Sequence, residues 1–487
     1  MLHSVDYGIG AEELAVATLA LLISCILSCS NYSGLNNPPQ FGDYEAQRHW
    51  MELSVNLPFS EIYKSGSQNN LSYWGVDYPP LTVYHSFILG KVKQNINADW
   101  VELQQSVGYQ SYGHKFFMRS SVIICWFFIY LPASFLFSSK LKNKAFVNGL
   151  LLLNPGLLLI DNAHFQYNAV SLGFFILCVN FLIVNKVVFG SICFCLALNY
   201  KQMELYHSLP IFCYLLSFCC ERSVKHFFIQ FTKLSSTVLI SFALLWLPYL
   251  ESKESVQQVI NRLFPLNRGL FEDKVANLWC TLNNVVKIRL IFDRSHLTIL
   301  SALVTLFASL PSCLLVFKKR SLENFFLSLA STSLSFYLFS YQVHEKSILL
   351  FCIPLIFLSN QLNGNILIHY LSICSLSMCH LYAKDEFLLA GITYTVLFSV
   401  MFHYFQSSIK THRSRAEHKS FIIVSWSGFL AIVSLIAFAP PPRKLPDIYV
   451  VLLCGFSFLH FFIFYLSTLV MVVQRFKFGI KRVNKTN

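Results

Sequence analysis

Apolar segments that could cross a membrane recur along the whole 487-residue chain, and they constrain its fold more than any other feature. A helix needs roughly 20 apolar residues to cross about 30 Å of hydrocarbon, and about 14 windows approach that length. These windows end near Ser28, Phe137, Ile160, Val184, Leu198, Phe218, Leu250, Phe317, Ser340, Leu358, Tyr382, Phe405, Ala439 and Val473. Only 13% of the residues are charged, against about 25% in soluble domains. The sequence therefore predicts an all-α polytopic membrane protein, with residues 1–487 forming one integrated domain.

Lysine and arginine are distributed unequally between alternate short loops. The basic set of loops, with the C-terminal tail, contains Lys140, Lys142, Lys144, Lys186, Arg222, Lys225, Lys318, Lys319, Arg320, Lys410, Arg413, Arg415, Lys419, Arg475, Lys477, Lys481, Arg482 and Lys485. The alternate loops contain only Lys201, Lys346, Lys384, Arg443 and Lys444. The positive-inside rule places the basic set in the cytosol, so we expect both termini there. The net charge of +13 is then mainly an orientation signal, and we expect no nucleic-acid partner.

Two long polar segments, residues 31–115 and 251–296, fall on the opposite, lumenal side by this count. Loops longer than about 15 residues in a compact protein usually serve as lids or sites. Most of the 15 cysteines lie inside apolar windows, and none recur at zinc spacing. We therefore expect two working lumenal loops, without a disulfide scaffold or a structural metal site.

The first lumenal loop carries acids in two places. The run GDYEAQRHWMEL contains Asp43 and Glu45, and the later run WGVDYPPLT contains Asp77. A carboxylate at the membrane surface, partly shielded by aromatic residues, is suited to take a proton from a sugar hydroxyl group. The alternative is that Asp43 caps an interfacial helix. The Pro79-Pro80 pair predicts a rigid turn.

Four further lumenal segments mix histidine, acid, amide and aromatic residues: DNAHFQYN, ALNYKQMELYH, FPLNRGLFEDKVANLWC and YQVHEKS. They supply His164, Gln166, Lys201, Gln202, Arg268, Glu272, Asp273, Lys274, His344, Glu345 and Lys346. Ionisable groups at the membrane boundary are costly unless paired or solvated, so their convergence predicts a polar cavity.

Each of these residues also has a structural explanation. The lysines could extend to the headgroups, the two loop acids could cap a helix, and His164 could be a buried structural histidine. The cytosolic loops lack this mixture, however. Cations suit a phosphate, amides and aromatic rings suit sugars, and an apolar bundle suits a lipid tail. The set therefore favours a lumenal sugar transferase that uses a lipid-phosphate donor.

The same motifs, in order from about Pro39 to Pro446, resemble the eukaryotic dolichyl-phosphate-glucose-dependent α-1,3-glucosyltransferases. The motifs are GDYEAQRHWMEL, LPFSEIY, YWGVDYPPLT, HFQYN, LNYKQMELYH, FPLNRGLFEDKVANLWC, SYQVHEKSILL and PPRKLPD. One departure is Asn162-Ala163, which precedes HFQYN where relatives often carry His-Gly. The resemblance implies GT-C architecture in the endoplasmic reticulum membrane, with a lumenal active site.

The activity implied by the resemblance is a step of N-glycosylation. The first glucose passes from dolichyl-phosphate-glucose to the nine-mannose lipid-linked oligosaccharide, Man9GlcNAc2-PP-dolichol, with inversion to an α-1,3 linkage. A paralogue that adds the second glucose is the nearest alternative, but the stretch from Phe271 to Asn277 and the EAQRHWMEL run favour the first activity. A transporter or scramblase of polyprenyl-linked sugars would instead predict charges spread through the bilayer or inverted repeats. A noncatalytic chaperone subunit would not need Asp43.

The resemblance also implies roles for individual residues. It makes Asp43 the general base that acts on the 3-hydroxyl group of the terminal mannose. It assigns the donor phosphate to His344, Lys346, Arg268 and Lys201. It assigns the sugar and acceptor pocket to Asp77, Glu45, His164, Gln166, Glu272 and Asp273. No cofactor is implied, and we expect no metal because cationic side chains can offset the charge of one phosphate.

Overall fold

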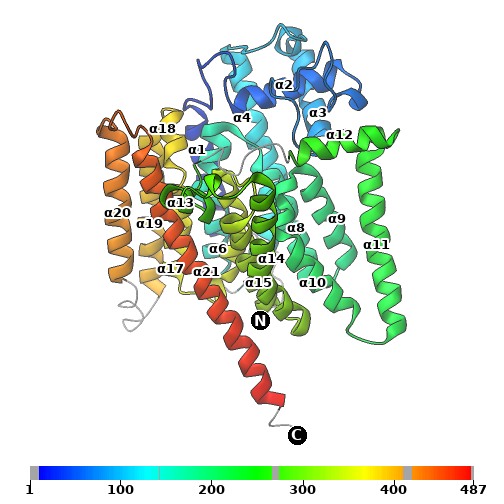
Figure 1. Cartoon of the computed structure of the whole chain (residues 1–487), viewed down its shortest axis with the longest axis vertical. Helices are drawn as coiled ribbons and strands as arrows, with labels where there is room; N and C mark the ends of the chain where they lie inside the picture. The colour runs from blue at the N-terminus through cyan, green and yellow to red at the C-terminus, as the bar shows by residue number, and fades with distance from the viewer. Residues whose placement is uncertain (1–9, 142, 266–273, 410–418, 484–487) are drawn as a thin grey trace.

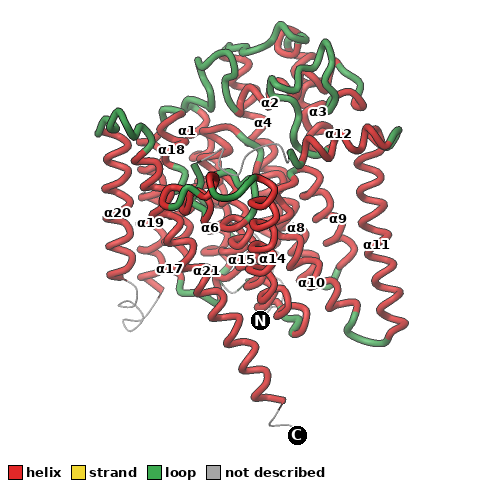
Figure 2. Tube along the Cα trace, in the orientation of Figure 1, coloured by secondary structure: helices red, strands yellow, loops and turns green. Residues whose placement is uncertain are grey.

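The computed structural model describes residues 10–141, 143–265, 274–409 and 419–483. Within these ranges the regular structure is helical, apart from one isolated bridge between Gly66 and Asn69. Figure 2 shows the helices in red, joined by loops in green. The predicted all-α fold is confirmed.

Eight segments of the described chain are long and apolar enough to cross a membrane. Five of them are single helices: α1 (Ala11–Ser28), α14 (Arg294–Lys318), α19 (Leu388–Ile409), α20 (Lys419–Phe438) and α21 (Ile448–Val483). The other three are continuous runs of helices. One run joins α4 (Tyr112–Cys125), η3 (Trp126–Tyr130) and α5 (Leu131–Ser138); another joins α6 (Lys144–Leu152), α7 (Pro155–Leu158) and η4 (Leu159–Phe165); the last joins α11 (Val224–Trp246) and η6 (Leu247–Tyr249).

Further helices, most of them shorter, complete the bundle. They are α8 (Asn168–Ile183), α9 (Val187–Tyr200), η5 (Gln202–His207), α10 (Ser208–Cys219), α15 (Leu322–Phe339), η8 (Glu345–Ile348), α16 (Leu349–Phe357), η9 (Leu358–Asn360), α17 (Gly364–Leu376) and α18 (Cys379–Lys384). Each apolar window of the sequence coincides with one or more helices. The count of about 14 spans stays a prediction, because helices such as α10 and α16 are too short to cross about 30 Å by themselves.

A second group of helices lies across one end of this bundle (Figure 1). This cap layer consists of α2 (Asp43–Asn56), η1 (Phe59–Glu61), α3 (Pro80–Ile96), η2 (Ala98–Val101) and α12 (Lys253–Leu263). Both long polar segments of the sequence contribute to it. The second segment also forms α13 (Leu278–Val285) and η7 (Ile288–Leu290) before α14 begins.

Local sequence explains where the helices of the cap layer begin and how they pack. Acids in the first turn of α2 favour its positive N-terminal end. The helix α3 begins at Pro80, so the predicted rigid turn coincides with its start. The two helices cross closely at Gly90, where an added Cβ atom would lie 2.5 Å from Val55 Cγ2. Beneath them, Trp50 and Leu53 belong to a separate apolar core.

Basic residues predicted to be cytosolic meet at the other end of the bundle. Lys319 Nζ donates to the carbonyl oxygen of Arg475 at 2.8 Å, and Arg320 forms an ion pair with Glu221 at 2.7 Å. The lower part of α21 extends from this end, away from α2 and α3 (Figure 1). The two ends therefore differ in the way that the loop charges predict.

Candidate functional site

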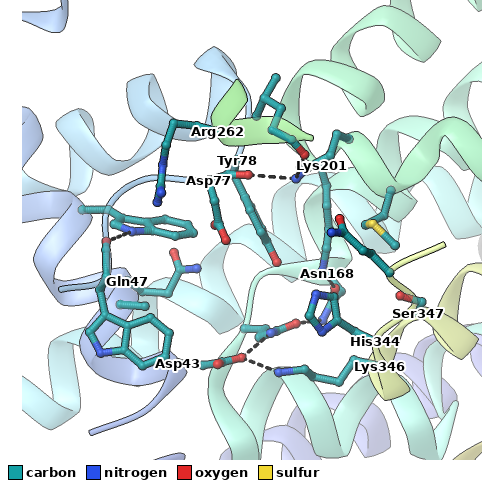
Figure 3. A pocket seen from close by; sticks show the side chains of 18 of the residues that line it. Asp43, Gln47, Asp77, Tyr78, Asn168, Lys201, Arg262, His344, Lys346 and Ser347 are labelled. Carbon is teal, nitrogen blue, oxygen red and sulfur yellow. Dashed lines mark hydrogen bonds and ion pairs between the residues drawn. The ribbon is translucent and has the colours of Figure 1, made fainter. Parts of the chain in front are cut away.

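A cavity of about 570 Å³ lies between the cap layer and the bundle. Its walls come from α2, the loop before α3, the start of α8, the segment after α9, the end of α12 and the segment around η8. Six of the predicted site residues line it: Asp43, Asp77, Gln166, Lys201, His344 and Lys346. Figure 3 shows Asp43 and Lys346 close together on one wall. The predicted convergence of these segments on a polar cavity is therefore present, and the volume of the cavity suits a small-molecule site.

Asp43 is the first residue of α2, and its side chain belongs to the cavity wall. Its Oδ2 atom accepts a hydrogen bond from Lys346 Nζ at 2.7 Å and another from the amide of Gln166. The Nε2 atom of His164 lies 3.2 Å from the same oxygen. Among the described residues, none donates to Oδ1. The alternative role of Asp43 as a helix cap is wrong, because its carboxylate contacts other segments and not the amides of α2.

Opposing electrostatic effects set the acidity of Asp43. Burial by itself raises the pKa of this carboxyl group, but the charge of Lys346 and the hydrogen bond with His164 outweigh that effect. The pKa of Asp43 is therefore held well below its usual value. Asp43 is an anion at neutral pH, held by partners that are distant in sequence.

The HFQYN motif builds the wall beside Asp43. It begins at the end of the π-helical turn η4, where Phe165 has a φ of +90°, and it leads into α8. The carboxylate of Asp161 accepts hydrogen bonds from the backbone nitrogens of Asn168 and Ala169 at 3.1 and 2.7 Å. Asp161 thereby supports the start of α8, a role that the sequence analysis did not foresee.

Asn168 connects this motif to Lys201. Its side-chain nitrogen donates to Gln166 Oε1 at 2.9 Å, and its Oδ1 atom accepts from Lys201 Nζ at 2.5 Å. Gln166 donates in turn to Asp43. A continuous chain of polar contacts therefore runs from Lys201 to the carboxylate of Asp43.

Two segments supply the lysine and histidine side chains of the cavity, and α12 supplies Arg262. Lys346 lies in η8, and His344 immediately precedes that turn. Lys201 follows α9 and lies 5.2 Å from the centroid of the Tyr78 ring. Burial, and then the nearby charge of Lys346, lower the pKa of Lys201. Lysine and histidine side chains gathered at one cavity suit an anionic ligand.

Asp77 and Arg262 define the opposite side of the cavity (Figure 3). Arg262, from the end of α12, donates to the carbonyl oxygens of Gly75 and Val76 at 2.5 and 3.1 Å. The carbonyl oxygen of Asp77 accepts from Gln202 Nε2 at 2.8 Å. Arg262 thus joins the two long polar segments of the sequence. The sequence analysis missed it, although its place in the second polar segment was a usable signal.

Two predicted sugar contacts do not line the cavity. His164 lies behind Asp43, with side-chain exposure of only 4%, and Glu45 forms an ion pair with Arg48 at 2.7 Å on the other side of α2. A direct sugar contact therefore does not fit either position. The predicted residues Arg268, Glu272 and Asp273 lie outside the described residues.

Asp385 is a further member of the site that the sequence analysis missed. It follows α18, and its Oδ2 atom lies 2.5 Å from His164 Nδ1. The available signal was its place just beyond the apolar window that ends near Tyr382, on the same predicted side as the motifs.

Comparison with known proteins agrees with this site. The ALG6, ALG8 glycosyltransferase family matches residues 17–467. The dolichyl pyrophosphate Man9GlcNAc2 alpha-1,3-glucosyltransferase of Gallus gallus is 44% identical, with 93% of this chain and 95% of the relative covered. The probable enzyme of the same name from Drosophila melanogaster is 42% identical, with 94% of this chain and 97% of the relative covered.

Among solved structures, ArnT from Cupriavidus metallidurans in the apo state is similar, with a TM-score of 0.40 and 12% identity. The match covers 95% of this chain and 76% of ArnT. The family match extends over most of the chain and includes every segment that lines the cavity. The chain belongs to the ALG6, ALG8 glycosyltransferase family.

Proposed function

We propose that the protein transfers the first glucose from dolichyl-phosphate-glucose to dolichyl pyrophosphate Man9GlcNAc2, and that it forms an α-1,3 linkage with inversion. The reaction takes place at the lumenal face of the endoplasmic reticulum membrane, in a GT-C-type enzyme with cytosolic termini. The observation that carries the proposal is the Asp43 carboxylate in a cavity that also presents Lys346, Lys201 and His344. The names of the relatives support the acceptor and the linkage.

Asp43 acts as the general base. Its Oδ1 atom, which has no donor among the described residues, accepts the hydrogen bond of the 3-hydroxyl group on the terminal mannose. The hydroxyl oxygen attacks the anomeric carbon of glucose as the bond from that carbon to the phosphate oxygen breaks. Dolichyl phosphate leaves with the electron pair. A single displacement of this kind inverts the anomeric centre, so a β-linked donor gives an α-linked product.

Lys346 connects donor binding to the strength of this base. Its Nζ atom lies 2.7 Å from Asp43, and its side chain belongs to the cavity wall. A donor phosphate in the cavity provides a second anion for Lys346, and Lys201 and His344 share that charge. The ion pair between Lys346 and Asp43 then weakens and the pKa of Asp43 rises, so the carboxylate becomes a better base when the donor is present.

We propose that neither a metal ion nor a cofactor takes part. The leaving group carries one phosphate, and the cationic side chains of the cavity can offset the charge that develops on it. Incubation with EDTA followed by removal of the chelator should leave the transfer rate unchanged. A loss of rate that Mg²⁺ or Mn²⁺ restores would contradict this part of the proposal.

The proposal is tested by glucose transfer from a synthetic dolichyl-phosphate-glucose analogue to the nine-mannose lipid-linked acceptor. Purified full-length wild type, Asp43→Asn and Asp99→Asn are compared; Asp99 is an exposed acid of the cap layer and is the matched control. We expect Asp43→Asn to lose about 10²- to 10⁴-fold in kcat, whereas Asp99→Asn keeps the wild-type rate.

Three other outcomes would overturn parts of the proposal. Full activity of Asp43→Asn would place the base elsewhere, with Asp77 the next acid on the cavity wall. Use of the acceptor only after it carries one glucose would identify the activity of the paralogue. Movement of the lipid-linked sugar across vesicle membranes without transfer would favour a transporter.

A further inference from the structure

A buried chain of ionisable groups continues behind Asp43, away from the cavity. The His164 ring lies between two acids, with Nδ1 at 2.5 Å from Asp385 Oδ2 and Nε2 at 3.2 Å from Asp43 Oδ2. Side-chain exposure falls along this chain, from 21% at Asp43 to 4% at His164 and 1% at Asp385. The three residues come from α2, η4 and the turn after α18, so the fold has brought together groups that are distant in sequence.

The backbone around His164 is held firmly, which fixes the direction of its ring. Its carbonyl oxygen accepts a hydrogen bond from the backbone nitrogen of Ser33 at 3.0 Å. The guanidinium group of Arg119 donates to the carbonyl oxygen of Ala163 at 2.9 Å and to that of Asn162. These hydrogen bonds satisfy backbone carbonyl groups of η4, whereas the ring nitrogens of His164 contact side chains.

The partners of the ring determine its tautomer. A carboxylate oxygen of Asp385 only accepts, so Nδ1 of His164 carries a hydrogen. In the neutral ring the Nε2 atom then presents a lone pair, which accepts from Lys346 Nζ at 3.2 Å. In the imidazolium form Nε2 instead donates to Asp43 Oδ2, also at 3.2 Å. Lys346 therefore bridges Asp43 and His164 before any donor is bound. If Lys346 turns toward a donor phosphate, Nε2 faces the Asp43 carboxyl group alone.

We infer that His164 and Asp385 are a positioning pair that receives the proton taken up by Asp43. The inference rests on the proposed transfer of glucose. The proton leaves the acceptor hydroxyl group for Asp43 and, once the carboxyl group has turned about its Cβ–Cγ bond, moves to Nε2 of His164. Asp43 returns to its carboxylate form, and the buried charge of Asp385 stabilises the resulting imidazolium ion. The proton passes to solvent when the products leave.

Asp385 could instead serve only to join the turn after α18 to η4, and one substitution separates the two roles. Asparagine at this position still accepts a hydrogen bond from Nδ1 but carries no negative charge. A purely structural contact survives Asp385→Asn, whereas stabilisation of an imidazolium ion does not.

The test compares kcat and KM of purified wild type with Asp385→Asn, Asp385→Glu, His164→Gln and the double variant Asp385→Asn/His164→Gln. Glu386→Gln is the matched control: Glu386 is the neighbouring acid, is exposed, and among the described residues its carboxylate accepts only from Asn31 Nδ2 at 2.9 Å. Thermal unfolding in detergent identifies variants that do not fold. We expect Asp385→Asn and His164→Gln each to lower kcat roughly 10- to 100-fold, with KM for both substrates unchanged.

Two further results are expected from a pair that acts as a unit. The double variant should lose no more activity than His164→Gln alone, because the charge of Asp385 acts only through the ring. Asp385→Glu should recover part of the rate, and Glu386→Gln should retain all of it.

Wild-type kcat in Asp385→Asn, or multiplied losses in the double variant, would overturn the inference. If the Asp385 variants fail to fold, His164→Gln decides alone, and wild-type kcat in that variant overturns it. A wild-type enzyme that transfers no glucose would instead contradict the proposed function, so the two failures can be told apart.

Discussion

Two polar networks share the helix α2, and they differ in whether their partners can be exchanged. On one side, Arg48 forms ion pairs with Glu45 and Glu52, each at 2.7 Å, and all three side chains are almost completely buried. On the other side, Asp43 and Lys346 are also 2.7 Å apart but have side-chain exposures of 21% and 17% at a cavity. The first network, which we call the closed network, has no room for a ligand. The second, which we call the open network, lies at the cavity, where a ligand can replace a partner. Similar ion-pair distances therefore serve structure on one side and chemistry on the other.

The largest effect is expected when Arg48, the cation of the closed network, is removed. We expect Arg48→Met to lower the free energy of unfolding by about 3–5 kcal/mol, because two buried carboxylates lose their common partner. Thermal and denaturant unfolding in detergent would measure the change. The exposed Lys91→Met is the control and should change stability by less than about 0.5 kcal/mol. An Arg48→Met protein as stable as wild type would show that this network does not support the cap layer.

Removal of Lys346, the cation of the open network, should instead affect activity more than stability. We expect Lys346→Met to destabilise the fold by less than Arg48→Met does, because Asp43 and Lys346 are partly exposed, and to lower kcat/KM for the donor by about 10²- to 10³-fold. The loss arises because the charge developing on the leaving phosphate is no longer offset by Lys346. Lys384→Met, at the exposed lysine that precedes Asp385 in the sequence, is the control. Equal losses of stability in Arg48→Met and Lys346→Met would remove the distinction between the networks.

The pH dependence of stability sharpens the comparison. Burial raises the pKa of Glu52, but the hydrogen bond with His49 and the charge of Arg48 lower it to about 2, from a usual value of 4.5. Because the folded-state pKa is lowered, Glu52 stabilises the fold fully above about pH 4.5, and its contribution is lost as the pH falls toward 2. The full contribution is about 3 kcal/mol. Unfolding measured from pH 7 to pH 3 should show a smaller acid loss in Glu52→Gln than in wild type. Parallel curves would contradict the assignment.

The smallest expected effect concerns Lys201, which lies in the open network but does not touch Asp43 directly. We expect Lys201→Met to raise KM for the donor about tenfold with little change in kcat, because one charged hydrogen-bond donor is lost from the phosphate site. Steady-state kinetics with varied donor would measure it. An unchanged donor KM together with a raised acceptor KM would place Lys201 in the acceptor site.

The helical fold was largely predictable, because chain-wide apolar windows report directly on membrane helices. Windows such as those ending near Leu250 and Phe317 correspond closely to α11 with η6 and to α14. The alternation of loop charge also predicted that Asp43, Lys201 and Lys346 would lie on one side. The number of spans was less accessible, since short helices such as α10 and α16 look apolar without being long enough to cross alone.

Side-chain direction within the site was not predictable to the same degree. Asp43 and Glu45 are two positions apart in one motif, and residues at that spacing on a helix point in different directions. Only the packing of α2 decides which acid meets the cavity. Asp385 was missed for another reason: its partner His164 is 221 positions away, and no local pattern encodes that pairing. Motif recognition identified the segments, whereas the tertiary fold selects the working residues.

The position of Asp43 at the beginning of the chain also bears on how the protein is made. Its partners His164, Gln166 and Lys346 follow it by 121, 123 and 303 positions, and Asp385 is translated later still. During N-to-C synthesis, α2 is therefore complete long before the cation of its carboxylate exists. Until then, water must solvate Asp43, and its acidity is that of an ordinary aspartate. The complete site is thus one of the last features to form, and a nascent chain that stops before η8 has Asp43 and Gln166 but lacks the Lys346 cation that pairs with the carboxylate.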